Sequence, residues 1–135
     1  MKGEAYNARC LLIVEDNKEV RSIFVEAFQG AGYHVLDAGD GKEAFQVMRR
    51  SNLRVDVILT DLRMPRMNGL EFAKKMRSDT RYAEIPIVLL SATPIRCSTE
   101  TFAVFSAVLL KPCSLTLLIS TVDAAFAANG STGQN

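Results

Sequence analysis

The sequence has little of several features that mark particular classes of protein. No apolar run approaches the roughly 20 residues that a membrane-spanning helix needs, and the N-terminus lacks the apolar core of a signal peptide. The three cysteines, Cys10, Cys97 and Cys113, are widely spaced and form no CxxC pattern. We therefore expect neither a disulfide framework nor a zinc site. Free thiols are typical of a reducing compartment, which favours a cytoplasmic protein without membrane contact.

Charge and glycine patterns exclude further classes. The net charge is +1 over 135 residues and no basic stripe stands out, which argues against direct binding of nucleic acid. No glycine-rich phosphate loop follows the first apolar run, so a flavin or nucleotide carrier is not favoured. The lone histidine, His34, lies in a predicted strand away from the polar residues discussed below, and we interpret it as structural.

The length fits one domain with a substantial core. Five short apolar runs, several of them rich in β-branched residues, predict strands that are buried on both faces. They cover residues 10–14, 33–38, 55–60, 85–90 and 107–110. Helical spacing between and after them predicts helices that begin after Asn17, at Gly41, after Gly69, at Ser98 and at Leu115. We expect a short N-terminal extension over 1–8, a folded domain over 9–128 and a disordered tail over 129–135.

The alternation of strands and helices predicts the topology. Strands separated by helices run parallel and are joined by right-handed crossovers. The expected fold is therefore a doubly wound α/β domain of five βα units, with the flavodoxin-like strand order 2-1-3-4-5.

Polar residues stand at the carboxyl ends of four predicted strands. They are Glu15 and Asp16, Asp61, Ser91, and Lys111 followed by Pro112. In the predicted order these ends lie at one edge of the sheet, where open α/β sheets bind ligands. Three carboxylates and one ammonium gathered there suggest a divalent metal and a phosphoryl group.

These residues resemble the receiver domain of two-component response regulators over roughly residues 9–128. The matching pieces are residues 12–17, 38–44, 56–69, 87–92 and 110–112. Each piece alone is a weak signal. All five in order, at strand ends, form a specific one.

The resemblance implies a phosphoacceptor and a magnesium site. Asp61 resembles the residue that is phosphorylated. Asp16 and Asp61 would bind Mg²⁺ directly, Glu15 through water, and Arg63 through its backbone carbonyl. Mg²⁺ prefers such oxygen ligands, and it reduces the repulsion between a carboxylate and an anionic phosphoryl group.

The resemblance also implies how the phosphoryl group is held. Lys111 would pair with it, Ser91 would hydrogen-bond it, and the small Ala92 would leave room for the donor. Three further residues shape the turns around the site: Pro65, Gly69 and Pro112, the last usually after a cis peptide bond.

Simpler readings of the same residues remain open. Asp61 could only cap the following turn. Glu15 and Asp16 could be a solvated start to a helix, where acids are favoured. Ser91 could cap the turn after its strand, and Asp56 is interpreted as structural.

The sequence departs from the family's pattern near the last strand. Val108 occupies the position, three before the lysine, where an aromatic switch residue is usual, and Phe105 is no obvious substitute. The segment between Ser91 and Lys111 is about two residues shorter than is usual in the family. The apolar residues Phe102, Val104 and Phe105 are either core residues or part of an altered partner surface.

Three functions compete. The first is a phosphoryl-accepting signalling module with a sensor histidine kinase or histidine phosphotransfer protein as donor and an output partner that the sequence does not name. The second is a pseudo-receiver that binds partners independently of phosphorylation. The third is a phosphatase with an aspartyl-phosphate intermediate, which is disfavoured because Arg63 stands where such enzymes place a second acid.

Overall fold

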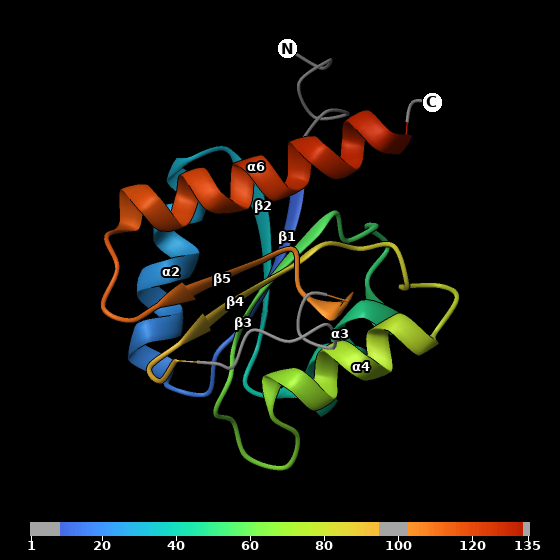
Figure 1. The fold of residues 1–135 in the computed structure, drawn as a ribbon, viewed down its shortest axis with the longest axis horizontal. Helices are drawn as coiled ribbons and strands as arrows, with labels where there is room; N and C mark the ends of the chain where they lie inside the picture. The colour runs from blue at the N-terminus through green and yellow to red at the C-terminus, as the bar shows by residue number, and fades with distance from the viewer. Residues whose placement is uncertain (1–8, 95–102, 134–135) are drawn as a thin grey trace.

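The sheet of the computed structural model has the predicted strand order. The structure describes residues 9–94 and 103–133. The strands are β1 (Arg9–Val14), β2 (Tyr33–Ala38), β3 (Val57–Asp61), β4 (Ile87–Ser91) and β5 (Ala107–Leu110). They lie in the order β2-β1-β3-β4-β5, and every neighbouring pair is parallel (Figure 1). The flavodoxin-like α/β fold expected from the sequence is confirmed.

Helices cover both faces of the sheet. The helices α2 (Lys18–Gly30) and α6 (Leu115–Gly133) pack on one face, and α3 (Gly41–Arg50) and α4 (Gly69–Ser78) pack on the other (Figure 1). Three helices start after a side chain that accepts a hydrogen bond from a backbone N–H of the first turn, which satisfies a donor with no helical partner. These caps are Asn17, Asp40 and Asn68.

The sheet separates two hydrophobic cores, and β1 contributes to both. Leu12 and Val14 belong to the core under α3 and α4, whereas Leu11 and Ile13 belong to the core under α2 and α6. All four side chains are at most 1% exposed. Successive strand residues point to opposite faces, so a continuous apolar run fills both cores. Each such side chain contributes roughly 1.5–3 kcal/mol when buried.

Two strands begin later than the sequence predicted. Strand β3 begins at Val57 rather than at residue 55, and β4 begins at Ile87 rather than at residue 85. For β4 the reason is Pro86, which has no N–H to donate to a neighbouring strand. Val55 and Ile85 are nevertheless buried, so both belong to the core as expected.

The last helix is longer than expected. Helix α6 extends to Gly133, so residues 129–133 of the expected disordered tail are helical. Alanines at 124, 125, 127 and 128 are strong helix formers, and extending an existing helix costs far less than starting one. Of the short helix expected over 98–105, only residues 103–105 are described, and 103 and 104 are helical.

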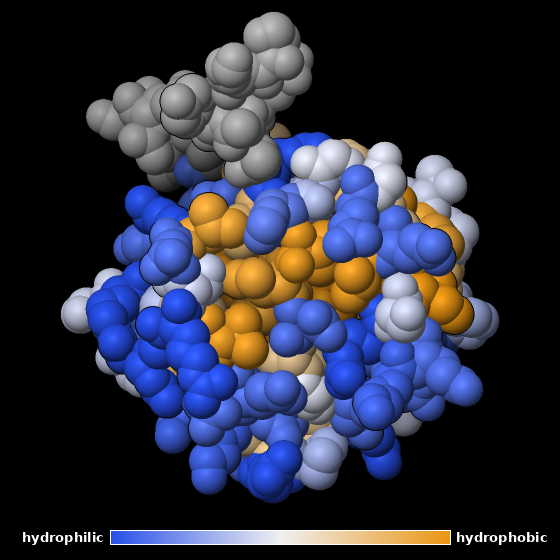
Figure 2. Space-filling view, turned by 180° about the vertical axis from the view of Figure 1, so that it is seen from behind, coloured by the Kyte–Doolittle hydropathy of each residue, from blue (hydrophilic) through white to orange (hydrophobic). Residues whose placement is uncertain are grey.

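The outer strand β2 leaves one side of the molecule partly apolar. Figure 2, which shows the molecule from behind, has apolar side chains gathered in the middle of that face, with hydrophilic ones around them. Val35 and Leu36 of the outer strand β2 are partly buried and pack against the two cores. No helix in the part of the chain that the structure describes is long and apolar enough to cross a membrane.

Candidate functional site

Three carboxylates gather at the carboxyl end of the sheet. Glu15 and Asp16 follow the last residue of β1, and Asp61 is the last residue of the neighbouring strand β3. One oxygen from each of the three carboxylates lies within 4.8 Å of the other two. Glu15 and Asp61 are buried, whereas Asp16 is exposed. Like charges this close repel one another unless a cation lies among them.

Lys111 supplies a positive charge from β5. It directly follows that strand, and its backbone N–H donates to the carbonyl of Ser91 over 2.8 Å. Its Nζ lies 3.3 Å from Oδ1 of Asp61 and 3.7 Å from Oε1 of Glu15. The peptide bond between Lys111 and Pro112 is cis, as the family resemblance implied. The expected meeting of these distant residues is therefore observed, and their roles stay predictions.

Glu15 is fixed by its backbone and by one carboxylate oxygen. Its N–H donates to the carbonyl of Ala38 over 3.0 Å, its carbonyl accepts from Nη1 of Arg21 over 2.7 Å, and Oε2 accepts from the N–H of Asn17 over 3.0 Å. The other oxygen, Oε1, is buried and accepts no hydrogen bond. Burial raises the pKa of Glu15, and the Asp61 carboxylate raises it further against the lowering effects of Asn17 and Lys111.

The oxygen of Glu15 that accepts no hydrogen bond fits a cation site. A buried acceptor without a hydrogen bond is costly, and a metal ion or a metal-bound water would satisfy it. The available ligands are all carboxylate oxygens, and no histidine or cysteine belongs to the cluster. Oxygen-only ligand sets suit Mg²⁺ or Ca²⁺ rather than zinc or copper. The described residues therefore fit a hard divalent cation.

Asp61 is oriented by its neighbour in the chain. Its Oδ1 accepts the N–H of Leu62 over 3.0 Å, in addition to the contact with Lys111. Among the described residues, no hydrogen-bond donor reaches Oδ2. One oxygen of Asp61 is therefore held, and the other is left available at the rim of the sheet.

The loop after Asp61 is held close to that residue at both ends. The N–H of Gly69 donates to the carbonyl of Leu62 over 2.7 Å. A Cβ added to Gly69 would collide with the carbonyl oxygen of Asp61, so only glycine permits this approach. Within the loop, the N–H of Met67 donates to the carbonyl of Pro65 over 2.7 Å, and the Arg63 side chain is exposed.

Arg66 is the residue that sequence reasoning missed. Its Nη2 and Nε donate to Oδ2 of Asp40 over 2.7 and 3.1 Å, and this ties the loop to the start of α3. Arg66 has a φ of 67°, in the left-handed region that side chains other than glycine rarely adopt. The only sequence signal was Asp40 itself, an acid at a helix start that the structure buries and that therefore needs a partner.

Ser91 lies at the same rim, but its hydroxyl is engaged locally. It is the last residue of β4 and is fully buried. Its Oγ donates to the carbonyl of Thr93 over 2.6 Å and lies 3.2 Å from the N–H of the same residue. This is the turn-capping arrangement that the sequence left open for Ser91. Ala92, next in the chain, is exposed. Contact of either residue with a phosphoryl group stays a prediction.

The structure describes the residues on and just before β5, where the family usually has an aromatic switch residue. Val108 lies on β5 with 38% of its surface exposed, whereas Phe105 and Val104 are each only 6% exposed and belong to the core under α3 and α4. The core interpretation of these two residues is confirmed. Phe102 lies outside the described residues.

Asp56 has the structural role that was expected. Its Oδ2 accepts the N–H of Cys10 over 2.9 Å, and its own N–H donates to the carbonyl of Cys10 over 2.8 Å. These contacts join the amino ends of β1 and β3, at the opposite end of the sheet from Asp61.

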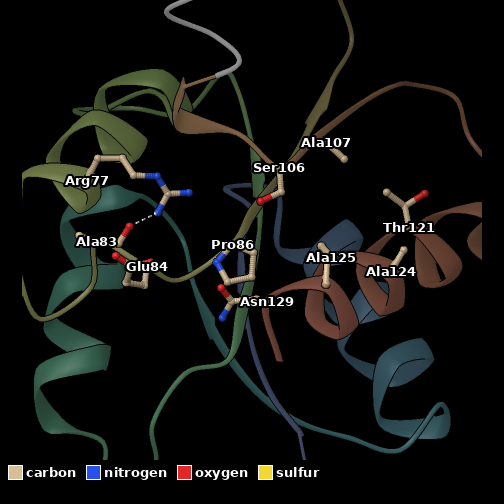
Figure 3. Close-up of a pocket in the computed structure, with 11 residues that line it drawn as sticks. Arg77, Ala83, Glu84, Pro86, Ser106, Ala107, Thr121, Ala124, Ala125 and Asn129 are labelled. Carbon is tan, nitrogen blue, oxygen red and sulfur yellow. Dashed lines mark hydrogen bonds between the residues drawn. The ribbon is translucent and has the colours of Figure 1, made fainter. Parts of the chain in front are cut away.

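Figure 3 shows a hollow away from the acidic residues, and the side chains that line it do not resemble a reactive site. Its volume is about 510 Å³, and it lies between the end of α4, the residues before β4 and β5, and one side of α6. Arg77 at its edge donates to the carbonyls of Ala83 and Ile85 over 2.9 and 2.7 Å. The guanidinium is thus hydrogen-bonded to backbone carbonyls, and among the described residues that line the hollow Glu84 is the single carboxylate.

Comparisons with known proteins agree with the geometry. A family model described as response regulator receiver domain matches residues 11–123. Chemotaxis protein CheY1 of Helicobacter pylori is 42% identical over 82 residues, which span 60% of this chain and 65% of that relative. The chemotaxis response regulator CheY4 of Vibrio cholerae has a similar structure, with a TM-score of 0.78 and 32% identity over 87% of this chain and 98% of that one.

One similar structure contains a metal. The receiver domain of sensor histidine kinase PA1611 from Pseudomonas aeruginosa was solved with a magnesium ion coordinated in its active-site cleft. Its TM-score is 0.77 at 25% identity, and the match covers 89% of this chain and 98% of that one.

Proposed function

Because this chain belongs to the response regulator receiver domain family, we propose that it accepts a phosphoryl group on Asp61 from a sensor histidine kinase or a histidine phosphotransfer protein. The observation that carries the proposal is the placement of Asp61. Its carboxylate lies 3.3 Å from the Lys111 ammonium and beside the carboxylates of Glu15 and Asp16. This arrangement combines a nucleophile, a fixed cation and a set of metal ligands at one edge of the sheet.

The proposal includes a bound magnesium ion. Asp16 and Asp61 would hold it directly, the buried Oε1 of Glu15 would face it through water, and the carbonyl of Arg63 would be a further ligand. When bound, Mg²⁺ neutralises part of the charge that builds up on the transferring phosphoryl group. The oxygen-only ligand set and the Glu15 oxygen that accepts no hydrogen bond support this assignment.

The residues of the chain have separate tasks in the transfer. The N–H of Leu62 holds Oδ1 of Asp61, so the carboxylate keeps a fixed orientation. One carboxylate oxygen of Asp61 attacks phosphorus, and an O–P bond forms as the N–P bond of the donor phosphohistidine breaks. The imidazole nitrogen leaves with the bonding electron pair. The Lys111 ammonium stabilises the negative charge on the phosphoryl oxygens.

Ser91 is proposed to report the phosphorylated state. To reach a phosphoryl oxygen its hydroxyl has to give up the 2.6 Å hydrogen bond to the carbonyl of Thr93. Phosphorylation would thereby release the turn after β4 and shift an equilibrium between two arrangements of that turn. The exposed Ala92 beside it leaves space for the donor.

We propose a signalling role without turnover of phosphomonoesters. Arg63 stands two residues after Asp61, where an aspartyl-phosphate phosphatase needs an acid, and its side chain is exposed. The two described cysteines are free thiols, which is consistent with a reducing compartment such as the cytoplasm. The set of acids, lysine and serine is complete despite Val108, which favours this function over the phosphorylation-independent alternative.

Intact-mass measurement tests the proposal. We expect the protein, incubated with acetyl phosphate and Mg²⁺, to gain the mass of one phosphoryl group, and we expect EDTA to prevent it. The isosteric variant Asp61→Asn removes the nucleophile and keeps the shape, so it should gain no mass. Equal labelling of Asp61→Asn, or no labelling of the wild type, would overturn the assignment.

A further inference from the structure

A groove between α3 and α4 carries a concentrated positive charge. Its volume is about 590 Å³, within the usual range of ligand-binding clefts. Four cations and one carboxylate line it, which gives the lining a net charge of +3, whereas the whole chain carries +1. The cations are Lys42, Arg49, Lys75 and Arg81, and the carboxylate is Asp79.

The acid in the groove is already neutralised. Arg81 donates from Nε and Nη2 to the two oxygens of Asp79 over 3.1 and 2.8 Å. Lys42 and Lys75 are exposed and make no ion pair among the described residues. Their charges are therefore available to a bound molecule, whereas the charge of Arg49 also acts on Asp79, which Arg81 already pairs.

The nearest acids outside the groove are occupied as well. Asp40 is held by Arg66, and Glu43 accepts the N–H of Gly39 over 2.6 Å. Glu71 accepts the N–H of Asn68 over 2.9 Å as part of a capping box. Each of these carboxylates is bound by a partner outside the groove, and among the described residues none of them forms an ion pair with Lys42 or Lys75.

The floor of the groove is apolar and firmly held. Phe45 is partly exposed, and its ring packs against Phe72 and Tyr82 with centroids 5.3 and 6.2 Å apart. Met67 lies beside it and packs on Gly41, where an added Cβ would lie 2.8 Å from the methionine sulfur. An apolar side chain could rest on this floor while charged groups meet the walls.

We propose that this groove binds an acidic polypeptide segment of a partner protein, with an apolar side chain resting on Phe45 and Met67. Lys42 and Arg49 stand seven residues apart on one helix, about 10 Å along its axis. Lys75 stands on the opposite helix. Cations spread in this way match carboxylates distributed along an extended chain, about three residues of which span the same distance. They match a single phosphate less well, because that ligand needs converging donors.

The proposal does not rest on the phosphorylation of Asp61. None of the four groove cations belongs to the acidic site, so the two proposals can fail separately. The acidic partner gives the molecule a binding surface on the helices that follow β2 and β3, in addition to the site at the rim of the sheet.

Fluorescence anisotropy with a defined probe tests the groove. The probe is a short fluorescein-labelled peptide in which glutamates flank a central leucine. We expect Lys42→Glu/Lys75→Glu to bind it at least roughly tenfold more weakly than wild type. The matched control is Arg50→Glu/Arg54→Glu, which makes the same change in net charge at exposed residues outside the groove, and it should bind nearly as well as wild type.

Two altered peptides and one competitor complete the test. Replacing the glutamates by glutamines should abolish binding, and replacing the leucine by glycine should weaken it. Equal losses in the groove and control variants would show unspecific attraction and overturn the proposal. So would binding of the glutamine peptide, or ATP that binds more tightly than the acidic peptide and displaces it. A circular dichroism spectrum and a thermal unfolding curve like those of wild type confirm that the groove variant is folded.

Discussion

The guanidinium of Arg66 donates two hydrogen bonds to one carboxylate oxygen of Asp40, and this pair joins the loop after β3 to the first turn of α3. The other oxygen of Asp40 accepts the N–H of Glu43 over 2.8 Å and caps the helix. The buried carboxylate of Asp40 thus bonds both to the loop that follows Asp61 and to the first turn of α3. The arrangement predicts that removing Asp40 and removing Arg66 lower the stability by different amounts.

Removing Asp40 should cost more stability than removing Arg66. The Arg66 side chain is 70% exposed, so solvent screens its charge, and Arg66→Ala should lose about 0.5–1 kcal/mol. Asp40→Ala also removes the helix cap, which adds about 1–2 kcal/mol. Urea unfolding of the two single variants and the double variant measures both values and their coupling. Equal losses in the two single variants would contradict the assignment of a dual role to Asp40.

The Asp40 pair should also make stability depend on pH. Burial acts to raise the pKa of Asp40, but hydrogen bonds from Glu43 and Arg66 outweigh it, so the pKa is lowered. Because the pKa is lowered in the folded protein, the ionised carboxylate stabilises the fold at any pH above its pKa in the unfolded chain, about 3.9 for aspartate. This stabilisation is lost as the pH falls towards the pKa in the folded protein. The stability difference between wild type and Asp40→Asn should therefore shrink below about pH 4. A difference that stays constant between neutral and acidic pH would exclude this contribution.

Glu15→Gln should stabilise the metal-free protein. The buried Oε1 accepts no hydrogen bond and burial raises the pKa of Glu15, so a neutral amide should gain about 1 kcal/mol even though it weakens the 3.7 Å contact with the Lys111 ammonium. Denaturant unfolding in the presence of EDTA measures the gain. The exposed neighbour offers a control, because Asp16→Asn should change stability by less than about 0.5 kcal/mol. A loss of stability in Glu15→Gln would mean that the carboxylate is satisfied without metal.

Magnesium should stabilise the wild type and fail to stabilise Asp16→Asn. A ligand at 100 times its dissociation constant adds about 2.7 kcal/mol to a protein that binds it only when folded. Thermal unfolding with and without magnesium chloride measures this shift. Glu26→Gln, an exposed acid of α2 outside the cluster, should keep the full shift. The same shift in Asp16→Asn as in wild type would remove Asp16 from the metal site.

Gly69→Ala should destabilise the protein and impair phosphorylation. The added methyl group would meet the backbone of Asp61 and Leu62, which cannot move aside without moving the phosphoacceptor. Such overpacking costs about 1–3 kcal/mol. Gly30→Ala is the matched control, since nothing lies within 4 Å of its added Cβ, and it should gain up to about 1 kcal/mol of helix stability. Acetyl phosphate labelling with similar rates in the two variants would contradict the close approach at Gly69.

The topology was predictable because each strand and helix carried its own signal. The run from Leu11 to Val14 had to be buried on both faces, and the helical patterns between strands left only parallel pairing. Once the order of strands was known, Asp61 and Lys111 had to meet Glu15 at one edge. Side-chain pairs across 46 or more positions in the chain thus followed from topology alone.

Other features depended on details that periodicity does not encode. The Arg66 conformation has no sequence signature, because a positive φ is usual for glycine and not for arginine. The hydroxyl of Ser91 could cap the turn after its strand or face a phosphoryl group, and the sequence pattern does not decide between the two. In the structure the hydroxyl bonds with Thr93. The end of α6 depended on the balance between alanine propensity and the polar residues that follow.

The hydrogen bond from the N–H of Cys10 to Asp56 fixes the register of β3 against β1. Neighbouring parallel strands can slip by one residue, and a slip would turn every side chain of β3 to the opposite face. Asp56 fixes that alignment at one end, and five residues later the strand ends at Asp61. The spacing of these two aspartates thereby sets where the Asp61 carboxylate stands relative to Glu15, although Asp56 lies at the opposite end of the strand.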